Sequence, residues 1–211
     1  MTTVACVLRS GGIYTPEWVW ALKRGIARHT AGVNFRILSD CSCFGLVGSL
    51  LEHNWPRWWA KIELFRPGLF SGPVVYLDLD TVIVGDLSEI LCYDGALALL
   101  SDFYRPTNGQ SGMMCWTPGP QSARLWERFV KDPGAMMRLY RGDGEYIHAV
   151  SGYQSDAPVH RLQDLFPGQI VSYKVHARQG PPPGARVVCF HGDPKPNDPS
   201  CGWAHRAWSQ L

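Results

Sequence analysis

The chain has 211 residues, of which 45% are hydrophobic, and a formal net charge of +2. This length suits one well-buried domain and is short for two, and the small charge, without a run of Lys or Arg, argues against nucleic acid or a polybasic membrane anchor. The first residues lack a secretion signal, and no stretch approaches the ~18 apolar residues of a membrane span. We therefore predict one domain over residues 1–211, soluble and cytoplasmic, with no nucleic-acid partner and no transmembrane segment.

Residues 3–40 are predicted to form a strand, a loop, a helix and a second strand. The apolar run Thr3–Leu8 predicts the first strand, and a small-residue loop over 10–12 follows it. Thr15 before Pro16 is a typical helix start, and apolar residues recur at helical spacing up to residue 32. The second strand is predicted over 34–39. A glycine loop after a strand lets backbone amides approach a nucleotide, although a plain tight turn has the same composition.

A helix over Asn54–Arg66 is predicted next. Its aromatic and aliphatic residues cover most of its circumference, so most of this helix is expected in the core. Lys61 is a cation within this apolar helix, shortly before an acidic strand. Its side chain either contacts a phosphate or a sugar, or extends from the surface into solvent.

The stretch Val74–Leu87 carries the strongest functional signal. Four apolar residues, Val74–Leu77, predict a buried strand that ends at Asp78, and Asp80 follows two positions later. Residues two apart on an extended backbone point the same way and lie roughly 6.5 Å apart, so both carboxylates can reach one cation. Two carboxylates this close also raise each other's pKa unless a positive charge lies between them. The sequence therefore predicts a metal ion at this strand end; the alternative is a pair of aspartates that only cap a turn.

Strands and helices continue to alternate in the second half. Strands are predicted over 96–100, 110–116, 160–165, 169–174 and 186–190, and helices over 121–131, with Phe129 and Val130 inward, and from Asp143 onward. Residues 180–184 predict a loop. This order predicts an α/β fold with a mostly parallel mixed sheet flanked by helices.

Cysteine usage does not indicate a disulfide framework. The chain has seven cysteines, an odd number, and no C-x-x-C pair. Cys6, Cys115 and Cys189 lie in apolar strand-like runs and are expected to be buried thiols. Cys41-Ser-Cys43 near His53 has the composition of half a zinc site, but no second half with the usual spacing follows.

Four segments resemble the family 8 glycosyltransferases, the glycogenin-like and bacterial galactosyltransferase-like enzymes of the GT-A fold. They are VLRSGGIY, WWAKIELFRPGLFSGPVVYLDLDTVIVGDL, QSGMMCW and CFHGDPKP, in that order, and they span nearly the whole chain. The lysine, apolar helix, short turn and YLDxDT of the second segment are the most specific. The resemblance implies a single-domain, Rossmann-like GT-A fold. It also implies a metal-dependent retaining enzyme that moves a hexose from a UDP-sugar to an unknown glycan, lipid-linked or protein acceptor.

The resemblance also implies roles for individual residues. Asp78 and Asp80 match the DxD motif that holds Mn²⁺, or alternatively Mg²⁺, against the donor phosphates, and Asp143 would orient acceptor or sugar in a front-face attack. The residues implied in donor binding are Leu8, Ser10 and Tyr14 at the uridine, Lys61 at phosphate or sugar, Asp102 and Ser111 at the sugar, and Gly192 and Lys195 at the pyrophosphate. A cation and two lysines suit this chemistry because the diphosphate leaves with a large negative charge.

Three positions depart from the family pattern. The family's metal-binding histidine stands three residues before Gly192, where this chain has Cys189. His191 lies on the same side of an extended strand as Cys189 and is predicted to replace that histidine as metal ligand. Gln110 replaces an asparagine, and Gly144 replaces a glutamine, which leaves no amide beside Asp143 and puts a nucleophile role there in doubt.

Two other functions fit parts of the sequence. DLDTV also satisfies the DxDx(T/V) motif of haloacid-dehalogenase-like phosphatases, with Asp78 as nucleophile, Asp80 as acid/base, and Ser101, Asp193 and Asp198 as later motif residues. That nucleophile usually follows the first strand, whereas roughly seventy residues precede this one. The other alternative is a catalytically inactive nucleotide-sugar-binding protein, because of the changes at positions 110 and 144.

Overall fold

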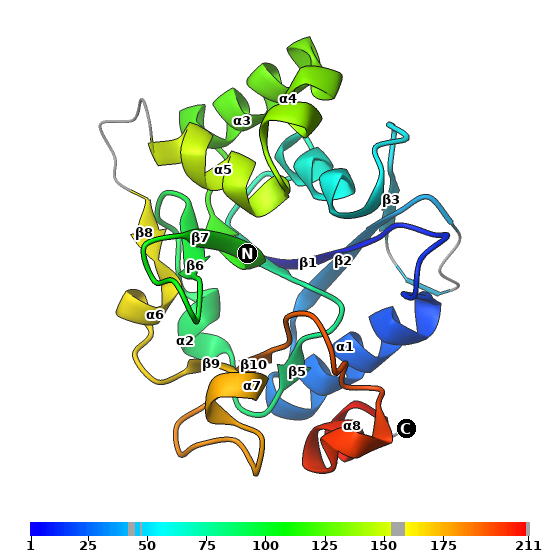
Figure 1. Ribbon diagram of the computed structural model, residues 1–211, viewed down its shortest axis with the longest axis vertical. Helices are drawn as coiled ribbons and strands as arrows, with labels where there is room; N and C mark the ends of the chain where they lie inside the picture. Colours follow the sequence, from blue (N-terminus) through cyan, green and yellow to red (C-terminus); the bar gives the residue numbers. More distant parts are fainter. Residues whose placement is uncertain (42–44, 47, 153–158, 210–211) are drawn as a thin grey trace.

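The computed structural model describes residues 1–41, 45–46, 48–152 and 159–209. Within these residues, seven strands form a mixed sheet in the order β3-β2-β1-β4-β7-β6-β8, and three form a small sheet in the order β5-β10-β9 (Figure 1). The strands are β1 (Thr3–Leu8), β2 (Asn34–Ser39), β3 (Gly48–Leu50), β4 (Val74–Leu77), β5 (Val82–Ile83), β6 (Ala98–Ser101), β7 (Gly109–Trp116), β8 (His160–Arg161), β9 (Ile170–Ser172) and β10 (Val187–Cys189).

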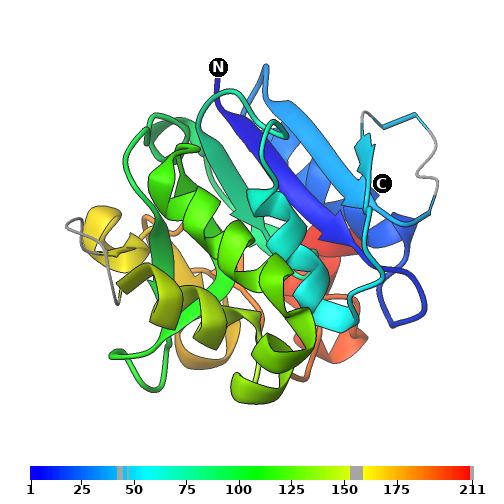
Figure 2. The ribbon, with the colours of Figure 1, turned by 90° about the horizontal axis from the view of Figure 1, so that it is seen from above.

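Helices cover both faces of the large sheet, which confirms the predicted α/β class (Figure 2). The α-helices are α1 (Pro16–His29), α2 (Ser88–Leu91), α3 (Pro120–Lys131), α4 (Pro133–Leu139), α5 (Asp143–Gly152), α6 (Leu162–Leu165), α7 (Tyr173–His176) and α8 (Trp203–Ser209), and the 3-10 helices are η1 (Arg57–Phe65) and η2 (Pro199–Cys201). No helix in the described part of the chain is both long and apolar enough to cross a bilayer.

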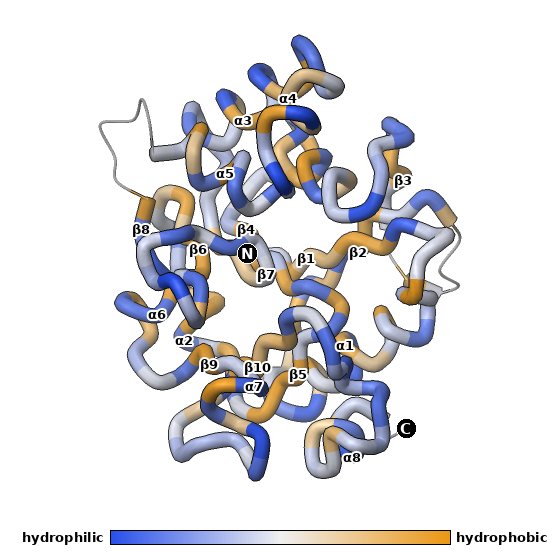
Figure 3. The backbone as a smooth tube through the Cα atoms, in the orientation of Figure 1, coloured by the Kyte–Doolittle hydropathy of each residue, from blue (hydrophilic) through white to orange (hydrophobic). Residues whose placement is uncertain are grey.

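The central strands are apolar throughout because both of their faces are buried. Along β1, Cys6 and Leu8 point into the core under α1, whereas Ala5 and Val7 point into the core under η1, α3 and α5. Figure 3 shows this pattern as hydrophobic strands inside a hydrophilic periphery. The central strands are thus packed between two cores.

The direction of β7 determines which residues lie beside the end of β4. β7 runs antiparallel to β4, with Leu77 opposite Met113, and the Asp78 amide donates a hydrogen bond to the Gly112 carbonyl at 2.9 Å. β7 therefore begins where β4 ends. Ser111 and its neighbours lie beside the acidic residues as a consequence.

Several predicted elements differ from the structure. The predicted strand over 160–165 ends at Arg161, because the Gln163 side chain binds both the amide and the carbonyl of Ser101, each at 2.8 Å, and so takes the place of a strand partner. The predicted strand over 169–174 ends at Ser172, whose hydroxyl accepts from the Val175 amide and caps α7. Val130 is exposed, not inward.

The remaining sequence expectations concern cysteines and the helix before β4. Cys6, Cys115 and Cys189 are all buried, as predicted. Cys43, part of the half zinc motif, lies outside the described residues. The helix predicted over 54–66 is present as the shorter 3-10 helix η1. This tighter winding changes which side chains of the segment share a face.

Candidate functional site

Most of the predicted site residues line one pocket of about 970 Å³ at the carboxyl end of β1 and β4. The predicted residues that line it are Ser10, Tyr14, Lys61, Asp78, Asp80, Ser111, Asp143, His191, Gly192 and Lys195. They come from the β1–α1 loop, η1, the end of β4, the start of β7, the start of α5 and the loop after β10. An open α/β sheet places ligands at this edge.

Lys61 is the centre of a buried cluster in this pocket. Its Nζ lies 2.9 Å from Asp78 Oδ1, 3.4 Å from Asp143 Oδ2 and 3.4 Å from Ser111 Oγ. Burial lowers the pKa of Lys61, but the charges of Asp143 and Asp78 outweigh burial, so its pKa is raised and the ammonium is retained. The lysine side chain is only 13% exposed, so the alternative of a solvent-extended surface lysine is wrong.

Asp143 reaches this cluster because α5 packs closely on β7. The Ser111 hydroxyl donates to Asp143 Oδ2 at 2.6 Å. A Cβ at Gly144 would lie 3.2 Å from the Ser111 amide nitrogen, so glycine permits this approach. Burial raises the pKa of Asp143, and Lys61 and Ser111 act in the opposite direction. Position 144, which differs from the family pattern, is thus part of how Asp143 is held.

Asp80 forms a second cluster with residues from the two ends of the chain. Lys195 Nζ binds Asp80 Oδ2, and the Tyr14 hydroxyl donates to the same oxygen at 2.8 Å. Burial and the neighbouring charge of Asp78 raise the pKa of Asp80, while Lys195 and Tyr14 favour its ionised form. Gly192 adopts a φ of 62°, which favours glycine, and a Cβ there would lie 3.3 Å from Lys174 Nζ. Two lysines therefore flank the loop after β10.

Asp40, at the end of β2, fixes the first loop. Its carboxylate accepts from the Ser10 amide at 2.7 Å and from the Ser10 hydroxyl at 2.6 Å, and it pairs with Arg9 at 2.9 Å. Arg9 also binds Asn54, in the segment before η1. Ser10 is thus a structural anchor of the pocket wall through its side chain.

His191 lines the pocket but is engaged away from the acidic pair. Its Nε2 lies 2.7 Å from Ser172 Oγ, and its ring stacks on Phe103 with centroids 5.7 Å apart. The predicted alternation from Cys189 to His191 does not hold, because β10 ends at Cys189. Burial and then the charge of Lys174 lower the pKa of His191, so it is neutral at pH 7.

The residues present fit a divalent cation in part. Among the described residues, no three side chains of His, Cys, Asp or Glu are grouped to hold a metal ion, so the predicted site of Asp78, Asp80 and His191 is not assembled. Cys189 stands where the resemblance implies a metal-binding histidine, and burial followed by the charges of Asp80 and Asp78 raises its pKa, which keeps the thiol protonated. The adjacent carboxylates of Asp78 and Asp80 are suitable oxygen ligands on their own.

Two predicted binding residues lie outside the pocket. Leu8 is fully buried in the core under α1, and its neighbours Val7 and Arg9 line the pocket instead. Asp102 organises the β6–β7 loop by accepting from the amides of Tyr104 and Arg105 and from the Gln110 side chain. Burial raises the pKa of Asp102, but these hydrogen bonds outweigh burial and lower it. Leu8 therefore supports the pocket through core packing, and Asp102 supports it by holding the β6–β7 loop.

Among the residues that line or anchor the pocket, the sequence reasoning did not assign Asp40, Arg57, Trp58 or Tyr76 to the site. Tyr76 donates to Asp78 Oδ1 at 2.6 Å, and its position two residues before Asp78 on one strand was a usable signal. Asp40 directly follows a parallel strand, as Asp78 does, so its position at the strand end was also a usable signal. The exposure of Trp58 depends on the 3-10 winding of η1 and was not predictable.

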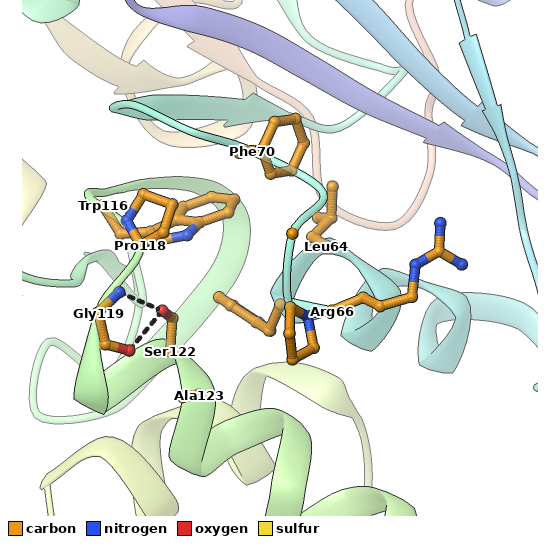
Figure 4. A pocket seen from close by; sticks show the side chains of 11 residues that line it. Leu64, Arg66, Phe70, Trp116, Pro118, Gly119, Ser122 and Ala123 are labelled. Atoms are coloured by element: carbon orange, nitrogen blue, oxygen red, sulfur yellow. Dashed lines mark hydrogen bonds between the residues drawn. The ribbon is translucent and has the colours of Figure 1, made fainter.

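A second, smaller pocket of about 290 Å³ lies at the other end of β4 and β7 (Figure 4). Trp116, Phe70, Leu64 and Pro118 line it, and no carboxylate does. Arg66, at its edge, is paired with Glu63 at 3.0 Å and Glu52 at 2.9 Å. The smaller pocket thus lacks the carboxylate pair that lies in the larger one.

Comparison with known proteins yields structures but no sequence relatives. No protein-family model matches the chain, and no curated protein sequence matches it. The solved glycosyltransferase GlyE of Streptococcus pneumoniae superposes with a TM-score of 0.71 at 12% identity, covering 99% of this chain and 60% of GlyE. This chain is therefore shorter than the GlyE structure that it matches.

Two further structures share the fold. An active-site mutant of LgtC matches with a TM-score of 0.65 at 12% identity, covering 98% of this chain and 94% of LgtC. The bifunctional glycosyltransferase WbbM matches with a TM-score of 0.59 at 13% identity, covering 98% of this chain and 51% of WbbM. LgtC is described as a galactosyltransferase and has been solved with donor and acceptor sugar analogs. The fold predicted from the sequence is confirmed: this chain has the GT-A fold of these glycosyltransferases.

Proposed function

We propose that the protein is a retaining glycosyltransferase that moves a hexose from a UDP-sugar to an acceptor. The observation that supports this proposal most is the convergence of Lys61, Asp78, Asp80 and Lys195 with the β1–α1 loop in one large pocket. The lysines supply the positive charge that stabilises a leaving diphosphate. The carboxylates keep the lysines from repelling one another when no ligand is bound. Glycosyltransferase neighbours with the same fold agree with this assignment.

A divalent cation, Mn²⁺ or Mg²⁺, is part of the proposal. The charged side chains lining the pocket are four basic ones, Arg9, Arg57, Lys61 and Lys195, and four acidic ones, Asp78, Asp80, Asp143 and Glu145, so their formal charges cancel. A diphosphate adds several negative charges to this neutral site. Asp78 and Asp80 would hold the cation, which when bound would stabilise the negative charge of the leaving diphosphate.

The chain's own residues have distinct tasks in this proposal. Lys195 and Lys61 bind the diphosphate oxygens, and Asp143, held by Lys61 and Ser111, orients the sugar or the acceptor hydroxyl. The anomeric C–O bond to the diphosphate breaks with its electron pair on the leaving oxygen. The acceptor oxygen bonds to the same face of the anomeric carbon, and its proton passes to the leaving diphosphate.

The direct test is release of UDP from a series of UDP-sugars, with Mn²⁺ and with excess EDTA. We expect slow release from at least one donor in Mn²⁺, and loss of release in EDTA or in Asp80→Asn. Thermal stabilisation by UDP without release from any donor would favour the inactive nucleotide-sugar-binding protein.

The phosphatase alternative has little support in the geometry. Ser101, Asp193 and Asp198, the residues that would complete its motifs, do not line the pocket that contains Asp78 and Asp80. Ser101 binds Arg161, and Asp198 caps η2. Release of inorganic phosphate from 4-nitrophenyl phosphate that is lost in Asp78→Asn would restore this alternative.

A further inference from the structure

Trp58 is an exposed aromatic side chain on the wall of the pocket. Its side chain is 42% exposed and lines the pocket, whereas Trp55 and Trp59 beside it in the sequence are buried. Large aromatic side chains normally stabilise a fold by burial, and at binding sites they supply a flat apolar face. An exposed indole on the wall of a pocket that also carries eight charged side chains points to a ligand.

The winding of η1 brings Trp58 close to the reaction cluster. η1 is a 3-10 helix of nine residues, and such runs seldom exceed about four residues and often mark functional segments. Side chains three residues apart eclipse in a 3-10 helix, so Trp58 lies one turn before Lys61 on the same face. Lys61 in turn contacts Asp78 and Asp143. Trp58 is thus adjacent to the point where transfer would occur.

Two neighbouring residues, Arg57 and Gly142, shape the surroundings of the Trp58 indole. Arg57 has a φ of 52°, the one positive φ at a non-glycine residue in the described chain, and its guanidinium lies 5.7 Å from the Trp58 ring centroid. Strained backbone of this kind concentrates at functional sites. On the other side, a Cβ at Gly142 would lie 3.2 Å from Trp58 Nε1, so glycine lets the indole edge approach the segment that leads into Asp143.

We propose that Trp58 and Arg57 form the acceptor subsite and that the acceptor is a carbohydrate. This inference rests on the proposed transferase function. The C–H face of a sugar ring would stack on the indole, while Arg57 and Glu145, both exposed and lining the pocket, bind its hydroxyls. A pocket of about 970 Å³ is near the upper limit for one small ligand, which leaves room for a donor and one acceptor ring. The acceptor hydroxyl thereby meets the anomeric carbon near Asp143.

The test compares transfer with hydrolysis of the donor. With the UDP-hexose that gives UDP release, 4-nitrophenyl glycosides of glucose, galactose, N-acetylglucosamine and lactose are added as probes, and glycosylated product and free hexose are measured in the same reaction. We expect at least one glycoside to be glycosylated. Trp58→Ala should lower the ratio of transfer to hydrolysis by about tenfold or more, and Trp58→Phe should retain most of it.

The matched control is Trp20→Ala. Trp20 is a half-buried surface tryptophan with Lys23 5.0 Å from its ring centroid, and it lines neither pocket. Its replacement should leave the ratio unchanged. Equal losses of transfer and hydrolysis in Trp58→Ala would assign Trp58 to the donor and overturn the proposal, as would transfer to none of the glycosides. Absence of UDP release with every donor would instead contradict the proposed function itself.

Discussion

The two halves of the pocket are built differently. Around Lys61 of η1, three side chains from the end of β4, from β7 and from α5 form one cluster between packed elements. Around Asp80, the partners Tyr14 and Lys195 come from loops, and Lys195 follows β10 by several residues. The half of the pocket around Lys61 is thus preformed by helices and strands, whereas the half around Asp80 is built from loops.

The replacement Lys61→Met should break the preformed half and give the largest effect. The buried Asp143 and the half-buried Asp78 would lose their shared cation, so we expect the free energy of unfolding to fall by about 3 kcal/mol and UDP release to fall more than about 100-fold. Chemical denaturation and UDP release measure the two effects. Lys131→Met, an exposed lysine on α3, is the control. Full activity in Lys61→Met would contradict the role of the cluster.

Gly144→Ala tests how closely α5 must pack on β7. The added methyl group would lie 3.2 Å from the Ser111 amide, so β7 or α5 must shift by a few tenths of an ångström and lengthen the Ser111–Asp143 hydrogen bond. We expect a loss of about 1 kcal/mol in stability and about tenfold in turnover. Gly152→Ala, in the same helix with open space around it, should not destabilise. Equal behaviour of the two variants would show that the approach at Gly144 is not needed.

Asp40→Asn tests the loop-built half and should have the smallest effect. Burial raises the pKa of Asp40, but the Ser10 hydrogen bonds and the Arg9 charge outweigh burial and lower it below its ordinary value of 3.8. Because its pKa is lowered, the ionised Asp40 carboxylate stabilises the folded state above pH 3.8. This stabilisation is lost as the pH falls through the lowered pKa. We expect Asp40→Asn to be less stable by about 1 kcal/mol at pH 7, and the difference to shrink in acid.

Asp40→Asn should also weaken donor binding a few-fold, because Asp40 holds Ser10 and Arg9, which line the pocket. Thermal unfolding between pH 7 and acid pH, with the exposed Asp164→Asn as control, measures the first effect. A stability difference that persists undiminished in acid would contradict the assignment to the ionised carboxylate.

Much of this site was predictable because strand ends are visible in sequence. Val74–Leu77 ends at Asp78, and the Arg9–Gly12 loop ends β1, so both could be placed at one sheet edge. Lys61 could be singled out as a cation in an apolar helix, and the role of Asp143 came from the family resemblance. Their mutual contact needs the antiparallel course of β7, which the alternation of elements does not reveal.

The parts that were not predictable depend on local backbone geometry. His191 could not be oriented from strand alternation, because β10 ends two residues before it. Leu8 and Asp102 stand at strand ends as expected, yet one points into the core and the other binds its own loop. The 3-10 winding of η1 has no clear signature in a segment with helical composition, so most of that segment was expected in the core and the exposure of Trp58 was not foreseen.

Calorimetric titration of UDP in the presence of Mn²⁺ tests the central claim most directly, that Asp78 and Asp80 form with the two lysines a site for a nucleoside diphosphate. We predict saturable binding to the wild-type protein, weaker by at least about tenfold without Mn²⁺ and in Asp80→Asn, and unchanged in Asp164→Asn. Equal UDP affinity of the wild-type protein and Asp80→Asn, with and without Mn²⁺, would contradict the account.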